Sequence, residues 1–319
     1  MNPITIALPT PFAVGPINVY LFTGGELTLV DTGAKTRLTM EVLRTGLAEH
    51  GYSVRDIRRL VITHAHVDHF GLAAQIASES GATVMTHPRN LYWLTDFQNE
   101  WVRRYDFYAD VFRESGLSDG LRQAVHDAGA TMTRFAESVP VGRLLEDGDV
   151  LSLDGASWQV LHLPGHAGGL ICLYEPEQRI LLSSDHLLKA ITSNPLLEPP
   201  QRGETARRRS LVEYLDSLKR TADLDIDLAL PSHGEPITDH RALIAERFLF
   251  HEARQERIVD LLGGGVRTAY QIAQGLFSSL APLDTFLAMS EVIGHLDVLE
   301  LAGRVHSRHR NGLLLYSLS

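Results

Sequence analysis

The sequence predicts an α/β protein, because short apolar runs typical of buried strands alternate with amphipathic helical patterns. The first observation is a hairpin pattern in residues 17–31, where two β-rich runs flank Gly24-Gly25. The second is a helical pattern in residues 36–50, where apolar side chains recur on one side. The third is the run of residues 59–63, a buried-strand pattern that leads into a cluster of histidines. This order of elements is typical of α/β architecture.

The same two patterns continue along the chain and predict the later elements. Asp-Gly pairs at 147 and 154 mark turns between the strands of the middle region. The predicted elements are a helix at 72–80, strands at 83–86, 150–153, 158–163, 170–174 and 180–184, a helix at 207–222, a strand at 228–231 and a helix at 239–262.

The C-terminal part begins after Gly263-Gly264-Gly265, the clearest linker pattern in the chain. Helical patterns at 268–277 and 283–302 precede a hairpin whose turn is Asn311-Gly312. Two helices followed by two strands resemble a winged helix, with the preceding helix as its first element. We therefore expect a large N-terminal domain in residues 1–240 and a small winged-helix-like α+β domain in residues 241–319.

Residues 90–140 interrupt the β pattern with an aromatic segment. Eight of the 23 Phe, Tyr and Trp residues lie within 21 positions, and four of them repeat at i, i+4 spacing, so one helical face would be aromatic. One interpretation is a helical insertion packed on the core. The other is a lid whose aromatic side chains line a substrate pocket, with Trp101 and Tyr105 as the candidate pocket residues.

Composition excludes several classes of protein. The hydrophobic fraction of 44% is enough for a sizeable core, and the 39 acidic against 29 basic residues give a net charge of −10 that disfavours binding to a phosphate backbone. The single cysteine, Cys172, cannot form an internal disulfide, which indicates a reducing compartment. The N-terminal residues show no signal-peptide pattern, and no apolar run approaches 18 residues. We therefore expect a cytoplasmic protein without a membrane span.

The strongest chemical signal is the segment 64–69, HAHVDH, which packs three imidazoles and one carboxylate directly after an apolar strand. Neutral imidazole and carboxylate are ligands for zinc, manganese or iron. In an irregular loop, the residues at i and i+2 can face one metal ion while those at i+4 and i+5 face another. A helix through the whole segment would turn His66 away, so the loop conformation matters.

Three more candidate ligands lie at predicted strand ends. His166 stands in PGHAGG, Asp185 in SSDH and His233 in PSHG, and each follows a β-type run. Strand ends are where α/β proteins build their sites.

Together with Asp31 in LVDTG, these motifs closely resemble those of the metallo-β-lactamase superfamily, in the family's order, over about residues 17–240. The resemblance implies a four-layer αββα sandwich with a two-metal site at one edge. It implies seven metal ligands: His64, His66 and His166 for one ion, Asp68, His69 and His233 for the other, and Asp185 bridging both, with a water or hydroxide between the ions.

The resemblance also implies the roles of the acids. Asp31 would accept a hydrogen bond from the site loop and orient a ligand. Asp68 and Asp185, the candidate catalytic residues, would offset part of the metal charge and leave a Lewis-acidic centre. Two divalent ions, most simply zinc with manganese or iron as alternatives, would activate a bridging hydroxide for hydrolysis. We expect a small ester, thioester or lactone as substrate.

Departures from the family's branches narrow the function. The β-lactamases of the superfamily lack a bridging acid at the position of Asp185, and flavodiiron proteins carry Glu where this chain has His66. Glyoxalase II and the acyl-homoserine lactonases share the full ligand set but are shorter and lack the C-terminal segment. Persulfide dioxygenases, which use one iron and fewer ligands, are a minor alternative.

The C-terminal segment raises a rival function. A winged-helix-like tail resembles the lactamase-beta-2-like group, where a relative is an endoribonuclease, so RNA phosphodiester cleavage is the alternative. Residues 283–302, however, contain four acids and no Lys or Arg. We therefore expect a small-molecule substrate, no nucleic-acid partner, and a tail that packs on the catalytic domain or forms a homodimer contact. A winged-helix binding protein with a vestigial metal domain is a further alternative.

Overall fold

The computed structural model describes residues 3–277 and 280–319, which fall into two compact units. The first unit comprises the chain up to Glu100 together with Met132–Ser193 and Ala222–His240, and the second comprises Trp101–Thr131, Asn194–Thr221 and Arg241–Ser319. The sequence predicts a single boundary at residue 240. The structure divides the chain differently, because its second unit also contains the segments 101–131 and 194–221, which the sequence places in the domain of residues 1–240.

Sheet A of the first unit contains six of the described strands in the order β1-β2-β3-β4-β5-β6. The strands are β1 (Ile4–Leu8), β2 (Ile17–Phe22), β3 (Thr28–Val30), β4 (Arg59–Ile62), β5 (Thr83–Thr86) and β6 (Arg143–Leu144). The pairs from β1 to β3 are antiparallel and those from β3 to β6 are parallel. Strands β1 and β6 are additions to the elements that the sequence predicts.

Sheet B contains five of the described strands in the order β11-β10-β9-β8-β7. The strands are β7 (Val150–Leu153), β8 (Ala156–His162), β9 (Ile171–Glu175), β10 (Ile180–Ser184) and β11 (Leu228–Pro231). The predicted turn at Asp154-Gly155 joins β7 to β8, and both residues have the positive φ angles that a two-residue hairpin turn requires, 51° and 77°.

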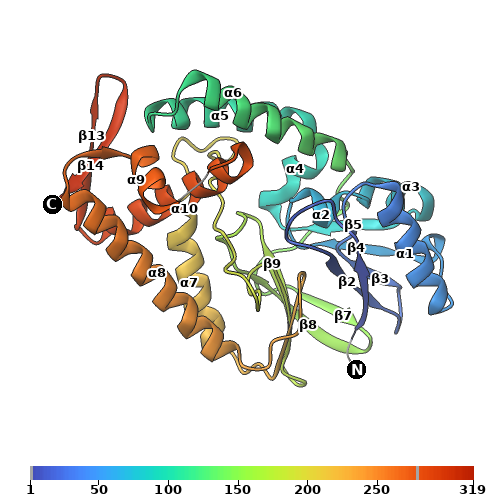
Figure 1. The fold of residues 1–319 in the computed structure, drawn as a ribbon. Coiled ribbons are helices and arrows are strands. Elements are labelled where there is room, and N and C mark those ends of the chain that lie inside the picture. The colour runs from blue at the N-terminus through green and yellow to red at the C-terminus, as the bar shows by residue number, and fades with distance from the viewer. Residues whose placement is uncertain (1–2, 278–279) are drawn as a thin grey trace. The chain divides into compact units, whose positions relative to one another are not determined.

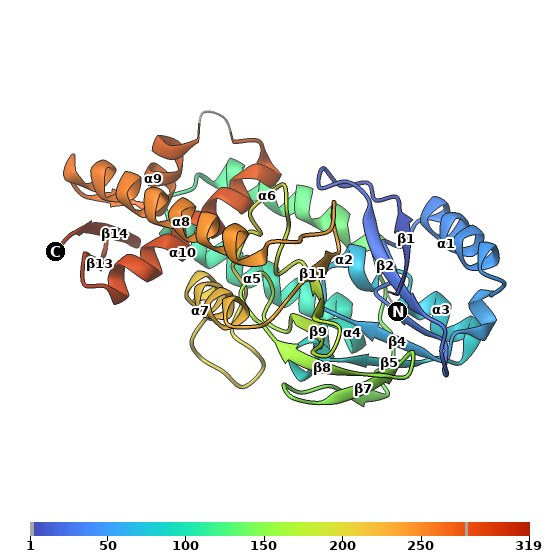
Figure 2. The same ribbon diagram turned by 90° about the horizontal axis from the view of Figure 1, so that it is seen from below.

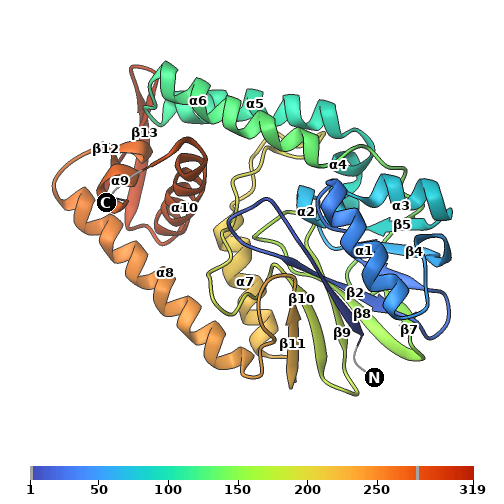
Figure 3. The same cartoon turned by 45° about the vertical axis from the view of Figure 1, so that its right-hand side comes forward.

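Helices and a shared apolar core organise the first unit. Helices α1 (Arg37–Glu49) and α3 (Ala73–Ser80) lie on the outer side of sheet A (Figures 1 and 3). Apolar side chains from both sheets meet between them, and the rings of Phe22 and Trp158 contact edge to face with centroids 5.2 Å apart. The same unit contains the short helices α2 (Val67–Phe70) and α4 (Leu91–Thr95) and 3₁₀ turns at Val54–Asp56, Pro88–Asn90 and Thr131–Phe135 (from Met132 onward).

The second unit is mainly helical. Its helices are α5 (Phe97–Glu114, from Trp101 onward), α6 (Asp119–Ala130), α7 (Ser210–Ala222, to Thr221), α8 (His240–Gly263, from Arg241), α9 (Ala269–Leu276) and α10 (Pro282–Leu301). One core cluster joins Tyr108 and Phe112 of α5 with Ile258 of α8 and Val292 and Leu296 of α10. This packing explains why the aromatic helix groups with the C-terminal segment.

The C-terminal elements follow the predicted order. Helices α9 and α10 precede the hairpin of β13 (Val305–Arg310) and β14 (Leu313–Leu318) (Figure 2). The short strand β12 (Arg267–Thr268) pairs with β14. The turn residues Asn311 and Gly312 both have positive φ, as an Asn-Gly hairpin turn requires. The description as a winged helix stays a prediction. Among the described helices, none combines the length and hydropathy needed to cross a membrane.

Candidate metal centre

Asp31 and the seven candidate ligands of the first unit gather where strands of its two sheets end. Asp31 follows β3, the segment 64–69 follows β4, His166 follows β8, Asp185 follows β10 and His233 follows β11. Strands β3 and β4 are parallel to each other, as are β10 and β11, so each pair delivers its following residues to one edge.

The segment 64–69 combines two conformations. His66 has extended backbone angles, φ −81° and ψ 147°, and helix α2 begins at Val67. The sequence favoured an irregular loop over a helix through the whole segment, and the structure has a loop as far as His66 and one helical turn after it. This change of direction lets His64 and His66 face one point while Asp68 and His69 face another.

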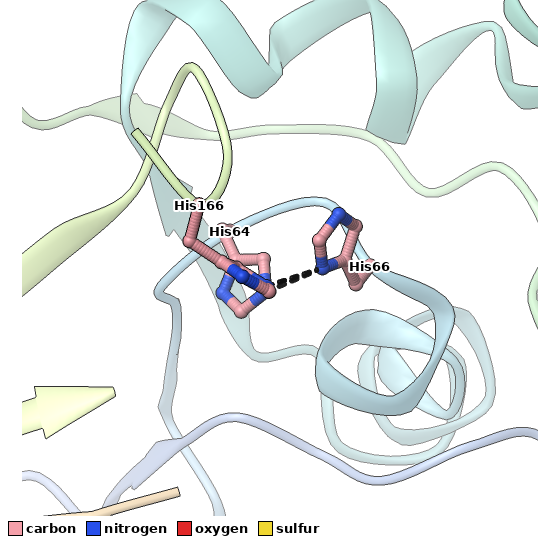
Figure 4. Close-up of side chains that lie close together, drawn as sticks. All are labelled: His64, His66 and His166. Carbon is pink, nitrogen blue, oxygen red and sulfur yellow. Dashed lines mark hydrogen bonds between the residues drawn. The ribbon is translucent and has the colours of Figure 1, made fainter. Parts of the chain in front are cut away.

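The first group of ligand atoms consists of three imidazole nitrogens. His66 Nδ1 lies 2.9 Å from His64 Nε2 and 2.9 Å from His166 Nε2 (Figure 4). His166 reaches this point from a different segment, 100 residues along the chain from His66. Three converging imidazole nitrogens form a typical ligand set for zinc.

The second group consists of one carboxylate and two imidazoles. Asp68 Oδ1 lies 4.0 Å from His69 Nε2, and Asp68 Oδ2 lies 3.5 Å from His233 Nε2. The three ligand atoms all lie within 4.8 Å of one another, which is close enough to share one ion.

Asp185 lies between the two groups. Its Oδ2 atom is 3.4 Å from His166 Nε2 and 3.6 Å from His69 Nε2, and its Oδ1 atom is 3.8 Å from His233 Nε2. Three buried atoms, Asp185 Oδ1, His69 Nε2 and His233 Nε2, have no hydrogen-bond partner among the described residues. Buried polar atoms without partners are costly, and a cation would satisfy all three at once. The residues present therefore fit a metal centre.

Hydrogen bonds at the far side of two rings fix which nitrogen faces the centre. His69 Nδ1 donates to Asp31 Oδ2 at 2.8 Å, and His233 Nδ1 donates to the carbonyl oxygen of Pro16 at 2.8 Å. In the neutral ring, each Nε2 then presents a lone pair to the centre. Asp31 thus contacts a candidate ligand through a hydrogen bond, which is the arrangement expected of it.

The neighbours of Asp31 form a network that sequence reasoning missed. Asp31 Oδ1 accepts from the Thr63 backbone NH and Oδ2 accepts from the Thr63 hydroxyl, both at 2.8 Å, and Ser184 Oγ donates to Thr63 Oγ1 at 2.8 Å. Asp31 and Ser184 have φ of 61° and 48°, a left-handed conformation that is strained outside glycine. The only signal in the sequence for the missed residues is position: Thr63 directly precedes the segment 64–69, and Ser184 lies within the SSDH motif.

The electrostatics of the centre favour a cation. Burial and the neighbouring imidazoles lower the pKa of His64 well below its ordinary value, so this ring is neutral at neutral pH. Burial alone would raise the pKa of Asp185, but the facing histidines, His69 first, hold it well below its ordinary range. Burial alone would lower the pKa of His69, yet the carboxylates, Asp31 first, hold it well above its ordinary value. Positive charge is therefore stabilised at this position.

The two predicted pocket residues belong to the second unit. Trp101 and Tyr105 lie one turn apart on α5, with ring centroids 5.4 Å apart. Trp101 is buried, Tyr105 is half-buried, and the Arg104 guanidinium lies over the Trp101 ring at 5.2 Å. The segment is helical as predicted, and its role as a pocket wall stays a prediction.

Comparisons with known proteins agree with this geometry. A sequence model of the metallo-beta-lactamase superfamily matches residues 13–233. The chain is 37% identical over 303 residues to the probable metallo-hydrolase YqjP of Bacillus subtilis, covering 93% of this chain and 92% of that protein. It is 31% identical over 175 residues to human acyl-coenzyme A thioesterase MBLAC2, covering 53% of this chain and 57% of that protein.

Two solved structures share the fold over nearly the whole chain. The metallo-beta-lactamase family protein TTHA1429 from Thermus thermophilus has a TM-score of 0.85 and 27% identity, over 99% of this chain and 98% of that one. A beta-lactamase domain protein from Burkholderia ambifaria has a TM-score of 0.85 and 25% identity, over 99% and 92%. The predicted α/β metallo-β-lactamase fold is therefore confirmed, whereas the winged-helix description of the C-terminal part stays a prediction.

Proposed function

Because the chain belongs to the metallo-β-lactamase superfamily of metal-dependent hydrolases, we propose that it hydrolyses a small ester, thioester or lactone at a dinuclear metal centre. The observation that carries this proposal is that six His and Asp side chains form two groups of three ligand atoms, with Asp185 as the seventh side chain between them. Two bound divalent ions supply an activated water and polarise the oxygen of the bond to be cleaved.

The candidate ligands differ in the charge that they would bring to the metal centre. His64, His66 and His166 are neutral donors and leave the charge of their ion undiminished, whereas Asp68 and Asp185 supply the two negative charges of the centre. The burial of Asp185 and His69 limits the access of bulk water, which strengthens electrostatic interactions inside the centre. A strongly Lewis-acidic centre of this kind suits hydrolysis without a serine or cysteine nucleophile.

The first test of this proposal is metal content. Protein purified without chelators should contain two divalent ions per chain, and zinc is the metal we propose, because three imidazoles form a typical zinc ligand set. Manganese and iron remain alternatives, since His and carboxylate ligands discriminate poorly among these metals. Elemental analysis by mass spectrometry checks the prediction, and a content of one ion or none would contradict the dinuclear centre.

The choice of a small acyl substrate over RNA rests on charge. Helix α10 has four acids and no Lys or Arg, and the chain carries a net charge of −10. RNA binding by phosphate contacts needs the opposite sign. The relative named as an acyl-coenzyme A thioesterase supports the acyl class, and we propose thioesters among the substrates on this basis.

A substrate chain-length series tests the proposed role of the aromatic segment. Residues 90–116 carry three Arg against five acids and eight aromatic side chains, a composition suited to an apolar acyl chain. Replacing Trp101 or Tyr105 by Ala should raise KM more for long-chain than for short-chain thioesters or lactones, because only long chains bury surface there. The measurement is steady-state kinetics of both variants over the series, which also shows which ring contacts the substrate.

The matched assay is cleavage of single-stranded RNA at several salt concentrations. We expect no RNA cleavage above background. Robust cleavage that weakens steeply with salt, together with no chain-length effect in either variant, would overturn the small-substrate proposal.

A further inference from the structure

We propose that Asn18 of β2 is a positioning residue for His233, and that it determines how tightly the second group, Asp68, His69 and His233, binds its ion. This inference rests on the proposed dinuclear centre. The observation behind it is a set of hydrogen bonds between the start of β2, in sheet A, and the turn 231–234, which begins at the last residue of β11 in sheet B.

Asn18 holds the turn on both sides of His233. Its side-chain Nδ2 donates to the carbonyl oxygen of Pro231 at 3.1 Å and to that of Gly234 at 3.0 Å. Its backbone NH donates to the carbonyl oxygen of Ser232 at 2.6 Å. One amide group thus binds the backbone on both sides of His233, and Asn18 is more than 200 positions away in sequence from both carbonyl groups.

Two neighbouring contacts act on the same turn. The Tyr20 hydroxyl donates to the carbonyl oxygen of Pro231 at 2.7 Å, and His233 Nδ1 donates to the carbonyl oxygen of Pro16 at 2.8 Å. The first contact shares an acceptor with Asn18. The second sets the tautomer of His233, so that Nε2 faces Asp68 and Asp185.

The side-chain chemistry at position 18 suits this task. The turn needs a residue in the left-handed region after His233, and Gly234 supplies it with φ 78°. Its carbonyl would otherwise rely on solvent, since Gly234 is exposed. An amide NH₂ group has two donors and can serve two carbonyls, whereas a carboxylate has none and an alanine removes both bonds. The loss of Asn18 should therefore let His233 shift away from Asp68.

The effect should be confined to one ion. His64, His66 and His166 come from segments to which Asn18 makes no hydrogen bond within the described chain, and their nitrogens converge independently of the turn 231–234. A positioning role therefore predicts weaker binding of the second ion alone. A general loss of stability would weaken the binding of both ions together.

The test is a metal titration of Asn18→Ala and Tyr20→Phe against a chromogenic chelator, with Co²⁺ spectra as a second readout. Hydrogen bonds that support a metal-binding residue typically contribute roughly 10–100-fold to metal affinity. The dissociation constant of the ion at Asp68, His69 and His233 should therefore rise by about that factor in Asn18→Ala, while that of the other ion stays unchanged. Tyr20→Phe should show a smaller rise, because Asn18 still holds Pro231. The Co²⁺ absorption of the second site should change with the affinity.

Tyr174→Phe is the matched control. The Tyr174 hydroxyl donates to the carbonyl oxygen of Asp225 at 2.8 Å, so it forms the same kind of bond just before β11, at the end of that strand opposite to His233. This variant should bind both ions as the wild type does. If Asn18→Ala binds both ions as tightly as a two-ion wild type, or loses both equally, the inference is overturned and the dinuclear centre stands. A wild type that binds fewer than two ions would overturn both.

Discussion

Replacing Asp185 by Asn should remove most of the second ion and lower kcat by about 10²–10³-fold, the range seen when a group that stabilises charge in a transition state is lost. The substitution preserves shape but removes the negative charge that faces His69, His166 and His233 at 3.4–3.8 Å. An amide NH₂ group would also direct hydrogens toward the ions. Mass spectrometry measures the metal content, and steady-state kinetics on a thioester or lactone measures kcat. Both quantities should fall together.

The fold should survive this substitution, because Asp185 supplies charge rather than packing. Asp154→Asn is the control: it also removes one carboxylate from the first unit, at a turn position with φ 51° that Asn tolerates. This control should keep two ions and normal kcat. An Asp185→Asn protein with two ions and near-normal kcat would show that Asp185 does not bridge the groups.

The candidate ligands could be predicted from sequence because their chemistry is concentrated in short motifs. The segment 64–69 holds four of them in six positions, and His166, Asp185 and His233 each follow a recognisable strand. Strand periodicity places such residues at sheet edges without any knowledge of side-chain packing. Convergence of the seven side chains in the structure follows from that topology.

Other features depend on contacts that leave no local pattern. The bonds from Asn18 and Tyr20 to Pro231 join a side chain to a backbone carbonyl across more than 200 residues, and any residue type supplies such a carbonyl. The grouping of α5 with α8 and α10 has the same origin. The aromatic periodicity of α5 predicts a buried face but does not name the partner that buries it.

The change of backbone conformation at His66 is another feature that the sequence does not predict. The sequence offers a loop and a helix as alternatives for the whole of 64–69, but the structure has extended backbone first and one helical turn afterwards. A single turn is too short for helical periodicity to appear in a sequence. The hydrogen bond from the Thr32 backbone NH to the carbonyl oxygen of His69 ties this turn to the loop after β3, again through a contact distant in sequence.

The largest expected effect on stability comes from Asp297→Ala in the second unit. Arg207 forms two parallel hydrogen bonds to Asp297, both at 2.6 Å, and the Asp297 side chain is only 3% exposed. Burial raises the pKa of Asp297 even though Arg207 lowers it, so the carboxylate depends on this partner. Breaking a buried ion pair by removing one partner costs about 3–5 kcal/mol. Arg207 is 27% exposed and can regain some water, which places the expected loss near the lower end.

Urea unfolding followed by circular dichroism measures this loss, with Asp216→Ala as the control. Asp216 pairs with Lys219 on the surface of α7, where both side chains are more than 60% exposed, and its removal should cost less than about 1 kcal/mol. If Asp297→Ala is as mild as this control, the pair does not stabilise the unit. The double replacement Arg207→Met with Asp297→Leu should recover most of the loss, because neither charge then remains buried without its partner. Recovery would show that apolar contacts can replace the ion pair, and that the single variant loses stability because Arg207 and its surroundings are left without the Asp297 side chain.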